Sequence, residues 1–192
     1  MIDKDTYERM KRFSDLGGSW AIWKMPKKGE GVKSGVGCMS IFNQPDINER
    51  LNSDYVFVGL NGARHDSSNV SYWHNFHSTD NKRQRDYKLR YALYGTKYWG
   101  AYMTDAIKCL KETDSSKVRL TIDEEIVHAE TLKGELDALG GDPVLVGMGV
   151  KSYAFLKRHF GETHKVVQIM HYSYYIGQDK YRDAVLDALK MF

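Results

Sequence analysis

Four short runs of apolar residues punctuate the chain, and each is followed by a longer segment with helical periodicity or a polar loop. Runs of consecutive apolar residues, rich in β-branched and aromatic side chains, are typical of strands buried on both faces of a sheet. Strands that alternate with helices indicate an α/β fold with a mostly parallel sheet. The predicted strands lie in residues 55–60, 99–105, 142–149 and 164–171.

The segment 121–141 carries the clearest helix signal. Thr121 is followed three residues later by Glu124, a capping-box pattern, and Gly140-Gly141 mark the helix end. Its predicted apolar face consists of Ile126, Ala129, Leu132, Leu136 and Leu139. Further helices are predicted over residues 3–18, 80–95, 151–160 and 179–192. In the helix 80–95, Tyr87, Tyr91 and Leu93 or Tyr94 are predicted to face inward. Residues 20–37, rich in glycine and lysine, are predicted to form a surface loop.

Polar or glycine residues follow each predicted strand. Asn61 ends the first, Asp105 the second, the turn 147–149 the third and His171 the fourth. Since ligands of open α/β sheets bind beyond the carboxyl ends of the strands, we expect these residues to approach one another. The long polar segment 63–81 follows the first strand, and loops of this length are often functional.

Composition indicates an ordinary folded chain. Of 192 residues, 42% are hydrophobic and 28% charged, which excludes a disordered chain and favours one domain spanning 1–192. No stretch is long and apolar enough for a membrane span, and the first residues lack the apolar core of a signal peptide. Two cysteines are too few for a disulfide scaffold, so the expected setting is cytoplasmic. The expected oligomeric state is a monomer.

The net charge of +3 and pI near 8.7 permit an anionic partner without requiring one. Basic residues cluster in the segments 24–33 and 82–90. Each cluster alone is more often a solvated face than a binding site.

The order of the residues that end the strands resembles the uracil-DNA glycosylase superfamily. Gly59-Leu60-Asn61-Gly62-Ala63 resembles the family's first motif, Gly-x-Asn-Pro-Gly, and His171-Tyr172-Ser173 resembles its last motif, His-Pro-Ser. Residues 143–160 are similar to the family's intervening strand, glycine turn and helix. The chain departs from the pattern because Gly62 and Tyr172 replace prolines.

The resemblance implies a three-layer α/β/α fold with a central, mostly parallel four-stranded sheet, and an N-glycosylase activity on a damaged or mismatched DNA base. It implies that Asn61 orients the attacking water and that His171 donates a hydrogen bond to the departing base. It implies DNA as partner and no cofactor. Further residues receive roles in the same way: base contacts for Gly59, Leu60, Gly62, Asp105 and Ser173, base stacking for Phe76 or Trp73, phosphate contacts for Lys151 and Ser152, and a duplex wedge for Tyr174 and Tyr175.

Asp105 stands where the family has a base-reading asparagine. An ionised aspartate only accepts hydrogen bonds, so it would repel O4 of uracil, whereas a protonated aspartate could donate to N3 of cytosine. Asp105 could equally cap the following turn or pair with Lys108.

Two other functions stay open on the sequence. His65, Asp66, His74 and His77 could hold a metal ion in a hydrolase, although no pair of carboxylates completes such a site. The chain could also be a glycosylase-like protein that binds nucleic acid or a nucleotide without catalysis, because fold does not determine function.

Overall fold

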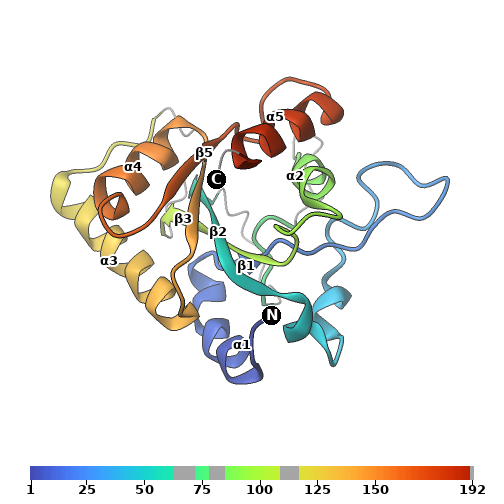
Figure 1. Ribbon diagram of the computed structural model, residues 1–192, viewed down its shortest axis with the longest axis horizontal. Helices are drawn as coiled ribbons and strands as arrows, with labels where there is room; N and C mark the ends of the chain where they lie inside the picture. The colour runs from blue at the N-terminus through green and yellow to red at the C-terminus, as the bar shows by residue number, and fades with distance from the viewer. Residues whose placement is uncertain (63–71, 78–84, 109–116, 191–192) are drawn as a thin grey trace.

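The computed structural model describes residues 1–62, 72–77, 85–108 and 117–190 (Figure 1). Its strands are β1 (Ser19–Trp20), β2 (Asn52–Asn61), β3 (Ala101–Ile107), β4 (Val144–Met148) and β5 (Val166–Ile169). Its α-helices are α1 (Lys4–Met10), α2 (Asp86–Leu93), α3 (Ile122–Leu139), α4 (Val150–Phe160) and α5 (Gln178–Lys190). Short 3₁₀ helices are η1 (Lys11–Leu16), η2 (Met39–Asn43) and η3 (Ile47–Arg50).

The sheet has five strands in the order β1-β3-β2-β4-β5, so the prediction of four strands is wrong. The additional strand, β1, pairs antiparallel with β3, and the other pairings are parallel. The predicted surface loop fails at its start, because Trp20, Ala21, Ile22 and Trp23 are all buried. Two tryptophans supply enough apolar area to hold this short segment in the core.

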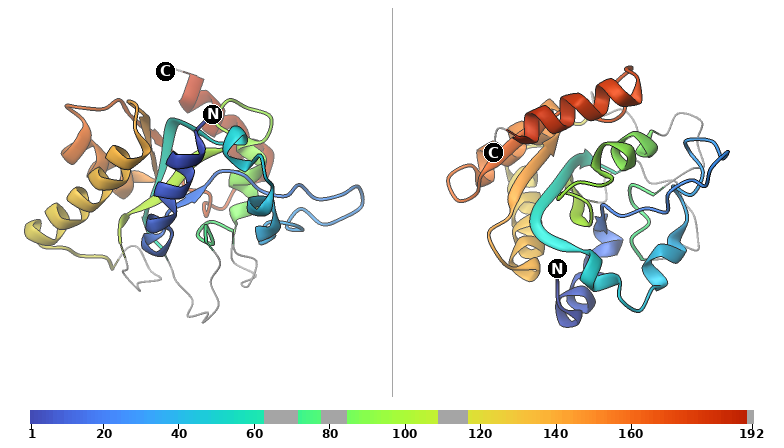
Figure 2. Two further views of the ribbon diagram at one scale, coloured as in Figure 1. Left: turned by 90° about the horizontal axis from the view of Figure 1, so that it is seen from below. Right: turned by 45° about the vertical axis from the view of Figure 1, so that its right-hand side comes forward.

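Helices cover both faces of the sheet, as the alternating pattern predicts. One hydrophobic cluster joins α1, α3 and α4 to one face, and a second joins α2 and α5 to the other (Figures 1 and 2). The molecule is therefore an α/β protein with a mostly parallel sheet between helical layers.

The ends of α3 agree with the prediction. The Thr121 hydroxyl accepts the Glu124 N–H, the Glu124 carboxylate accepts the Thr121 N–H at 2.8 Å, and the helix ends at Gly140 with φ +77°. Of the predicted apolar face only Ile126 is exposed.

The inward face of α2 differs from the prediction. Leu89, Ala92 and Leu93 are buried, whereas Tyr87 and Tyr91 are only partly buried and Tyr94 is exposed. Lys88 and Arg90 are buried as well, a feature that periodicity does not anticipate. The part of the predicted helix before residue 85 lies outside the described residues.

The register sets which side chains meet at the carboxyl edge. Gly59 lies beside Asp105 on adjacent strands, Val58 lies beside Gly147, and Met148 lies beside Ile169. The chain adds β3 on one side of β2 and then β4 on the other. The carboxyl end of β2 is therefore the switch point where such sheets bind ligands.

Candidate active site

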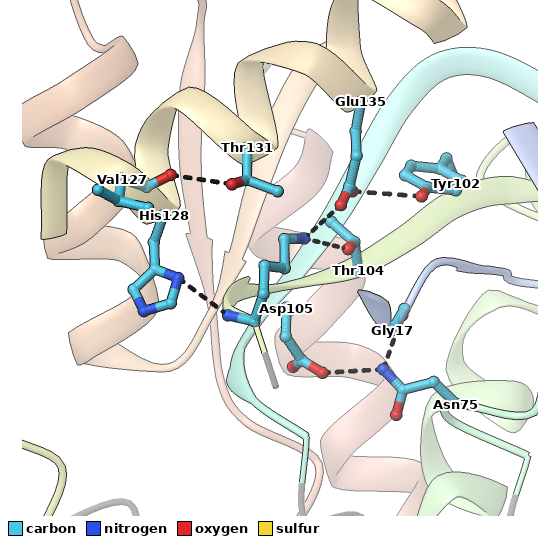
Figure 3. Close-up of polar contacts among 10 residues, drawn as sticks. Gly17, Asn75, Tyr102, Thr104, Asp105, Val127, His128, Thr131 and Glu135 are labelled. Atoms are coloured by element: carbon cyan, nitrogen blue, oxygen red, sulfur yellow. Dashed lines mark hydrogen bonds and ion pairs between the residues drawn. The ribbon is translucent and has the colours of Figure 1, made fainter. Parts of the chain in front are cut away.

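The Asp105 carboxylate lies in a cradle at the carboxyl end of β3. One oxygen, Oδ2, accepts a hydrogen bond from Asn75 Nδ2 at 2.8 Å, and the same Nδ2 donates to the Gly17 carbonyl at 2.8 Å (Figure 3). A Cβ at Gly59 would overlap Asp105 Oδ1, and one at Gly62 would lie 2.9 Å from Oδ2. The glycines of the first motif therefore make room for an acid that is only 3% exposed.

Gly59→Ala should destabilise the fold by about 1–3 kcal/mol, because the new methyl group overlaps the buried Asp105 carboxylate. Urea denaturation measures the loss. Gly134→Ala is the matched control: its added Cβ meets nothing within 4 Å inside α3, so it should be neutral or gain up to about 1 kcal/mol. If the overlap with Asp105 is the cause, the double variant Gly59→Ala/Asp105→Ala loses less stability than the sum of the losses of the two single variants. Strictly additive losses would contradict this cause.

Phe76 reaches the same place from a strained segment. Its ring carbon Cε1 would lie 3.6 Å from a Cβ at Gly59, and the residue has φ +64°. Trp73 also has a positive φ of +69°. Bulky residues in the left-handed region cost on the order of 1–3 kcal/mol each and often mark functional sites.

Hydrogen bonds hold this segment against β1 and its neighbours. Trp23 Nε1 donates to the Phe76 carbonyl at 3.0 Å, and the Ser19 hydroxyl donates to the Trp73 carbonyl at 2.7 Å. The Trp73 ring donates to the Tyr7 hydroxyl and is only 1% exposed. It packs in the hydrophobic cluster on the α1 and α3 face of the sheet, whereas Phe76 packs in the cluster on the other face. Of the two candidate stacking residues, Phe76 therefore lies beside Asp105, and Trp73 is a core residue.

Asn61 is the last residue of β2 and is partly buried. Asn61 pairs with Ile107 of β3, three residues beyond Val58, the last residue of β2 with a partner in β4. His171 lies two residues after the end of β5, which is parallel to β4, so both residues follow the carboxyl ends of parallel strands. The expected approach of Asn61, Asp105 and His171 to one edge agrees with this arrangement.

His171 is held in one tautomer. Its Nδ1 accepts the Ser173 N–H at 3.2 Å and lies 2.7 Å from the Ser173 hydroxyl, so the ring proton is on Nε2. Burial lowers the pKa of His171 to about 4, which keeps the ring neutral at pH 7. Ser173 thus orients the histidine, a role different from the predicted base contact. Gly149, with φ +96°, makes room beside it, since a Cβ there would lie 3.4 Å from the His171 Cβ.

Two residues that the sequence did not single out belong to this site. Asn75 bridges Asp105 and Gly17, as described above. Tyr172 stacks on His171 with ring centroids 4.3 Å apart. Burial raises the pKa of Tyr172 well above its usual value, and the nearby carboxylates of Asp86 and Asp105 raise it further. Tyr172 lies between His171 and Ser173, which is the sequence signal for its place in the site. From the sequence it was identified only as a departure from the motif, because the family has proline at this position.

The remaining predicted contacts divide between surface and core. The Leu60 side chain packs against the hydrophobic cluster on the α1 and α3 face of the sheet. Only its backbone can therefore face a ligand beside Asp105 and Phe76. The Ser152 hydroxyl is buried and donates to the Val58 carbonyl at 2.6 Å, which gives Ser152 a structural role in place of the predicted phosphate contact. Lys151 is exposed at the start of α4. Tyr174 and Tyr175 are exposed, so neither packs into the core.

The alternative metal site receives little support. His77 is fully buried, its Nε2 lies 2.8 Å from the Ile22 carbonyl oxygen and its Nδ1 lies 2.9 Å from the Asn75 carbonyl oxygen. His65 and Asp66 lie outside the described residues. Within the described part of the chain, no group of three or more potential ligands gathers around a common point.

A buried ion pair lies on the other side of β3 (Figure 3). Lys108 Nζ lies 2.6 Å from Glu135 Oε1 and donates to the Thr104 hydroxyl at 2.6 Å, and the Tyr102 hydroxyl donates to Glu135 Oε2 at 3.2 Å. The ion-pair partner of Lys108 is thus Glu135, an acid of α3 that the sequence analysis did not single out. Asp105 and Lys108 therefore belong to separate networks on opposite faces.

No family model matches the chain, and no curated protein matches it. Among the described residues, no helix combines the length and apolar character needed to cross a bilayer. The class that the fold defines is that of α/β proteins with a polar site at the carboxyl edge of a mostly parallel sheet.

Proposed function

We propose that the protein is an N-glycosidase that hydrolyses the bond between a sugar and a damaged or mismatched base in DNA. The observation that carries the proposal is the arrangement at one sheet edge of an amide, a neutral imidazole and an aromatic ring, supplied by Asn61, His171 and Phe76. The order of these residues along the chain resembles uracil-DNA glycosylases, and the α/β fold is compatible with that family.

Breaking an N-glycosidic bond leaves positive charge on the sugar and negative charge on the base. A catalyst for this reaction positions a water at the anomeric carbon. Asn61 is the last residue of β2 and pairs with Ile107 of β3, so its backbone is held on that side. An amide oxygen orients a water without removing its proton, which suits a reaction whose electrophile is already strongly activated.

His171 can stabilise the departing base. Its Nε2–H is a neutral donor, because Ser173 occupies Nδ1 and burial keeps the pKa near 4. A donor fixed in advance stabilises charge as it develops on a base carbonyl, with no reorganisation during the reaction. Ser173 acts through the histidine and is a positioning residue.

Asp105 and Phe76 would form the back of the base site. Both lie against Gly59, so a base next to Phe76 would also meet the acid. The Asn75 amide already donates to Asp105, and the acid is nearly enclosed. An ionised carboxylate only accepts hydrogen bonds, which favours a base that offers a donor, such as an exocyclic amine, over the O4 of uracil.

The same enclosure favours a second candidate function. If Asp105 serves only to hold Asn75 and the segment 72–77, the edge binds nucleic acid without cleaving it. Such a protein keeps the fold and the polar edge of the sheet but produces no abasic sites.

Asn61→Ala should lower the rate of base release by about 100-fold or more, the usual loss when one positioned polar group is removed. The assay incubates the full chain with oligonucleotides that contain uracil, hypoxanthine, xanthine or mismatched pyrimidines, and detects abasic sites by alkaline cleavage. Asn43→Ala, at an exposed asparagine of η2, is the matched control and should retain full activity. Equal rates for both variants would contradict the role of Asn61, and absence of product on every substrate would favour the binding function.

A further inference from the structure

Helix α2 carries two buried cations that hold surface segments on either side of it. Lys88, 1% exposed, donates from Nζ to the Tyr174 carbonyl at 2.6 Å. Arg90, 2% exposed, donates to the carbonyls of Lys24, Val32 and Ser34 at 2.5–2.8 Å. Burying a charge is costly, and these two side chains donate to neutral carbonyls. Such an arrangement indicates that the position of the two segments matters.

The segment held by Arg90 is the lysine loop, residues 24–34. It projects from the body of the molecule beyond α2 (Figures 1 and 2). Glu30, its one acid, accepts the Lys27 N–H at 2.9 Å and the Ser34 hydroxyl at 2.8 Å, so this carboxylate closes the loop. The loop presents four exposed lysines, Lys24, Lys27, Lys28 and Lys33.

The segment held by Lys88 is the aromatic turn, residues 171–177. Its backbone is ordered by hydrogen bonds from the Tyr174 N–H to the His171 carbonyl at 3.0 Å and from the Ile176 N–H to the Tyr174 carbonyl at 2.9 Å. The turn presents Tyr174, 63% exposed, and Tyr175, 89% exposed. Aromatic side chains this exposed gain no stability from the core, so both rings are accessible to a partner.

The first turn of α2 connects the two segments. The Lys33 ammonium lies 5.7 Å from the Tyr87 ring centroid, and the Arg85 guanidinium lies 5.4 Å from the Tyr175 ring centroid. Both separations are within the range of cation–π contacts. Cations and aromatic rings therefore alternate from the lysine loop, across α2, to the aromatic turn beside His171.

We propose that the lysine loop, the first turn of α2 and the aromatic turn form one surface that binds single-stranded nucleic acid. Lysine and arginine attract the phosphates, and exposed tyrosine rings stack on unpaired bases. A duplex offers the same phosphates but keeps its bases stacked, so only a single strand uses both features. The inference rests on the proposed function for the place of the target base, next to His171, and it names the substrate as single-stranded.

The test measures binding of the full chain to labelled oligothymidylate and to a duplex of equal length by fluorescence anisotropy at several salt concentrations. We expect tighter binding to the single strand. Tyr175→Ala should weaken that binding roughly 10-fold and leave duplex binding unchanged. Lys27→Ala/Lys28→Ala should reduce the slope of log affinity against log salt by about 1.4, the value for two lost phosphate contacts on a single strand.

Lys4→Ala/Lys157→Ala is the matched control, because it removes the same charge from exposed lysines of α1 and α4. Equal affinity for single strand and duplex, loss of affinity in the control as large as in the loop variant, or binding to phosphatidylserine vesicles in place of oligonucleotides would each overturn the proposed surface. Base release, measured in parallel, separates the two proposals. Selective binding without base release refutes the glycosidase, and base release that Tyr175→Ala and the loop variant leave unchanged refutes the surface.

Discussion

Lys108→Met should lower the free energy of unfolding by about 3–5 kcal/mol, because it leaves the Glu135 carboxylate buried without its cation. Glu135 is fully buried, and the Lys108 ammonium is its ion-pair partner at 2.6 Å. Burial raises the pKa of Glu135, and the ammonium opposes that rise. Removing the ammonium raises the pKa further, so the folded variant holds a proton that the unfolded chain releases.

The pH dependence identifies the cause. Below the ordinary pKa of 4.5 the carboxyl is protonated in both states, so the loss is smallest there and grows as the pH rises. Urea denaturation across this range measures it. Lys108→Met/Glu135→Leu should recover most of the stability, and the exposed Lys133→Met, which breaks the Lys133–Asp137 pair, should cost under about 0.5 kcal/mol. A small, pH-independent loss for Lys108→Met would show that the ion pair is not needed.

Acidification should remove about 3 kcal/mol of stability through His77 between about pH 7 and pH 4. Burial lowers the pKa of His77 from 6.5 to about 4, although two backbone carbonyls favour its protonation. The unfolded chain therefore binds a proton at a higher pH than the folded protein. The contribution is fully present above pH 6.5 and is lost as the pH falls to about 4.

His77→Gln tests this assignment. The variant is less stable at neutral pH because it loses ring contacts to Ile22 and Trp23, but its stability should fall less on acidification than that of the parent. His164→Gln, between α4 and β5, is the matched control for replacing a histidine by glutamine. If His77→Gln and the parent lose equal stability between neutral and acidic pH, another group is responsible.

Local sequence signals predicted the elements whose cause is local. The four long strands and the capping box of α3 depend on neighbouring residues, so a single segment contains the signal. The strand β1 does not depend on its sequence neighbours alone. Ser19 and Trp20 become a strand only because β3 offers them an edge, and no pattern within residues 17–23 encodes that partner.

In the candidate site, too, the sequence predicted what depends on neighbouring residues and missed what depends on distant partners. The placement of Gly59 beside Asp105 follows from the parallel register of two strand ends. The hydrogen-bond partner of Asp105 could not be predicted from the strand register. Asn75 contacts Asp105 from a segment whose backbone position depends on contacts with Gly17 and β1. The same limit applied to Lys108, since Asp105 is closer to it in sequence but Glu135 lies on the same side of the sheet. The glycosylase resemblance itself stays a prediction.

The two buried cations of α2 have a consequence for the dynamics of the molecule. Lys88 and Arg90 are one half-turn apart on a helix of only eight residues, so transient fraying of that helix detaches both anchored segments together. Their opening and closing is then one cooperative event with a single equilibrium constant. A partner that immobilises either segment thereby raises the order of the other.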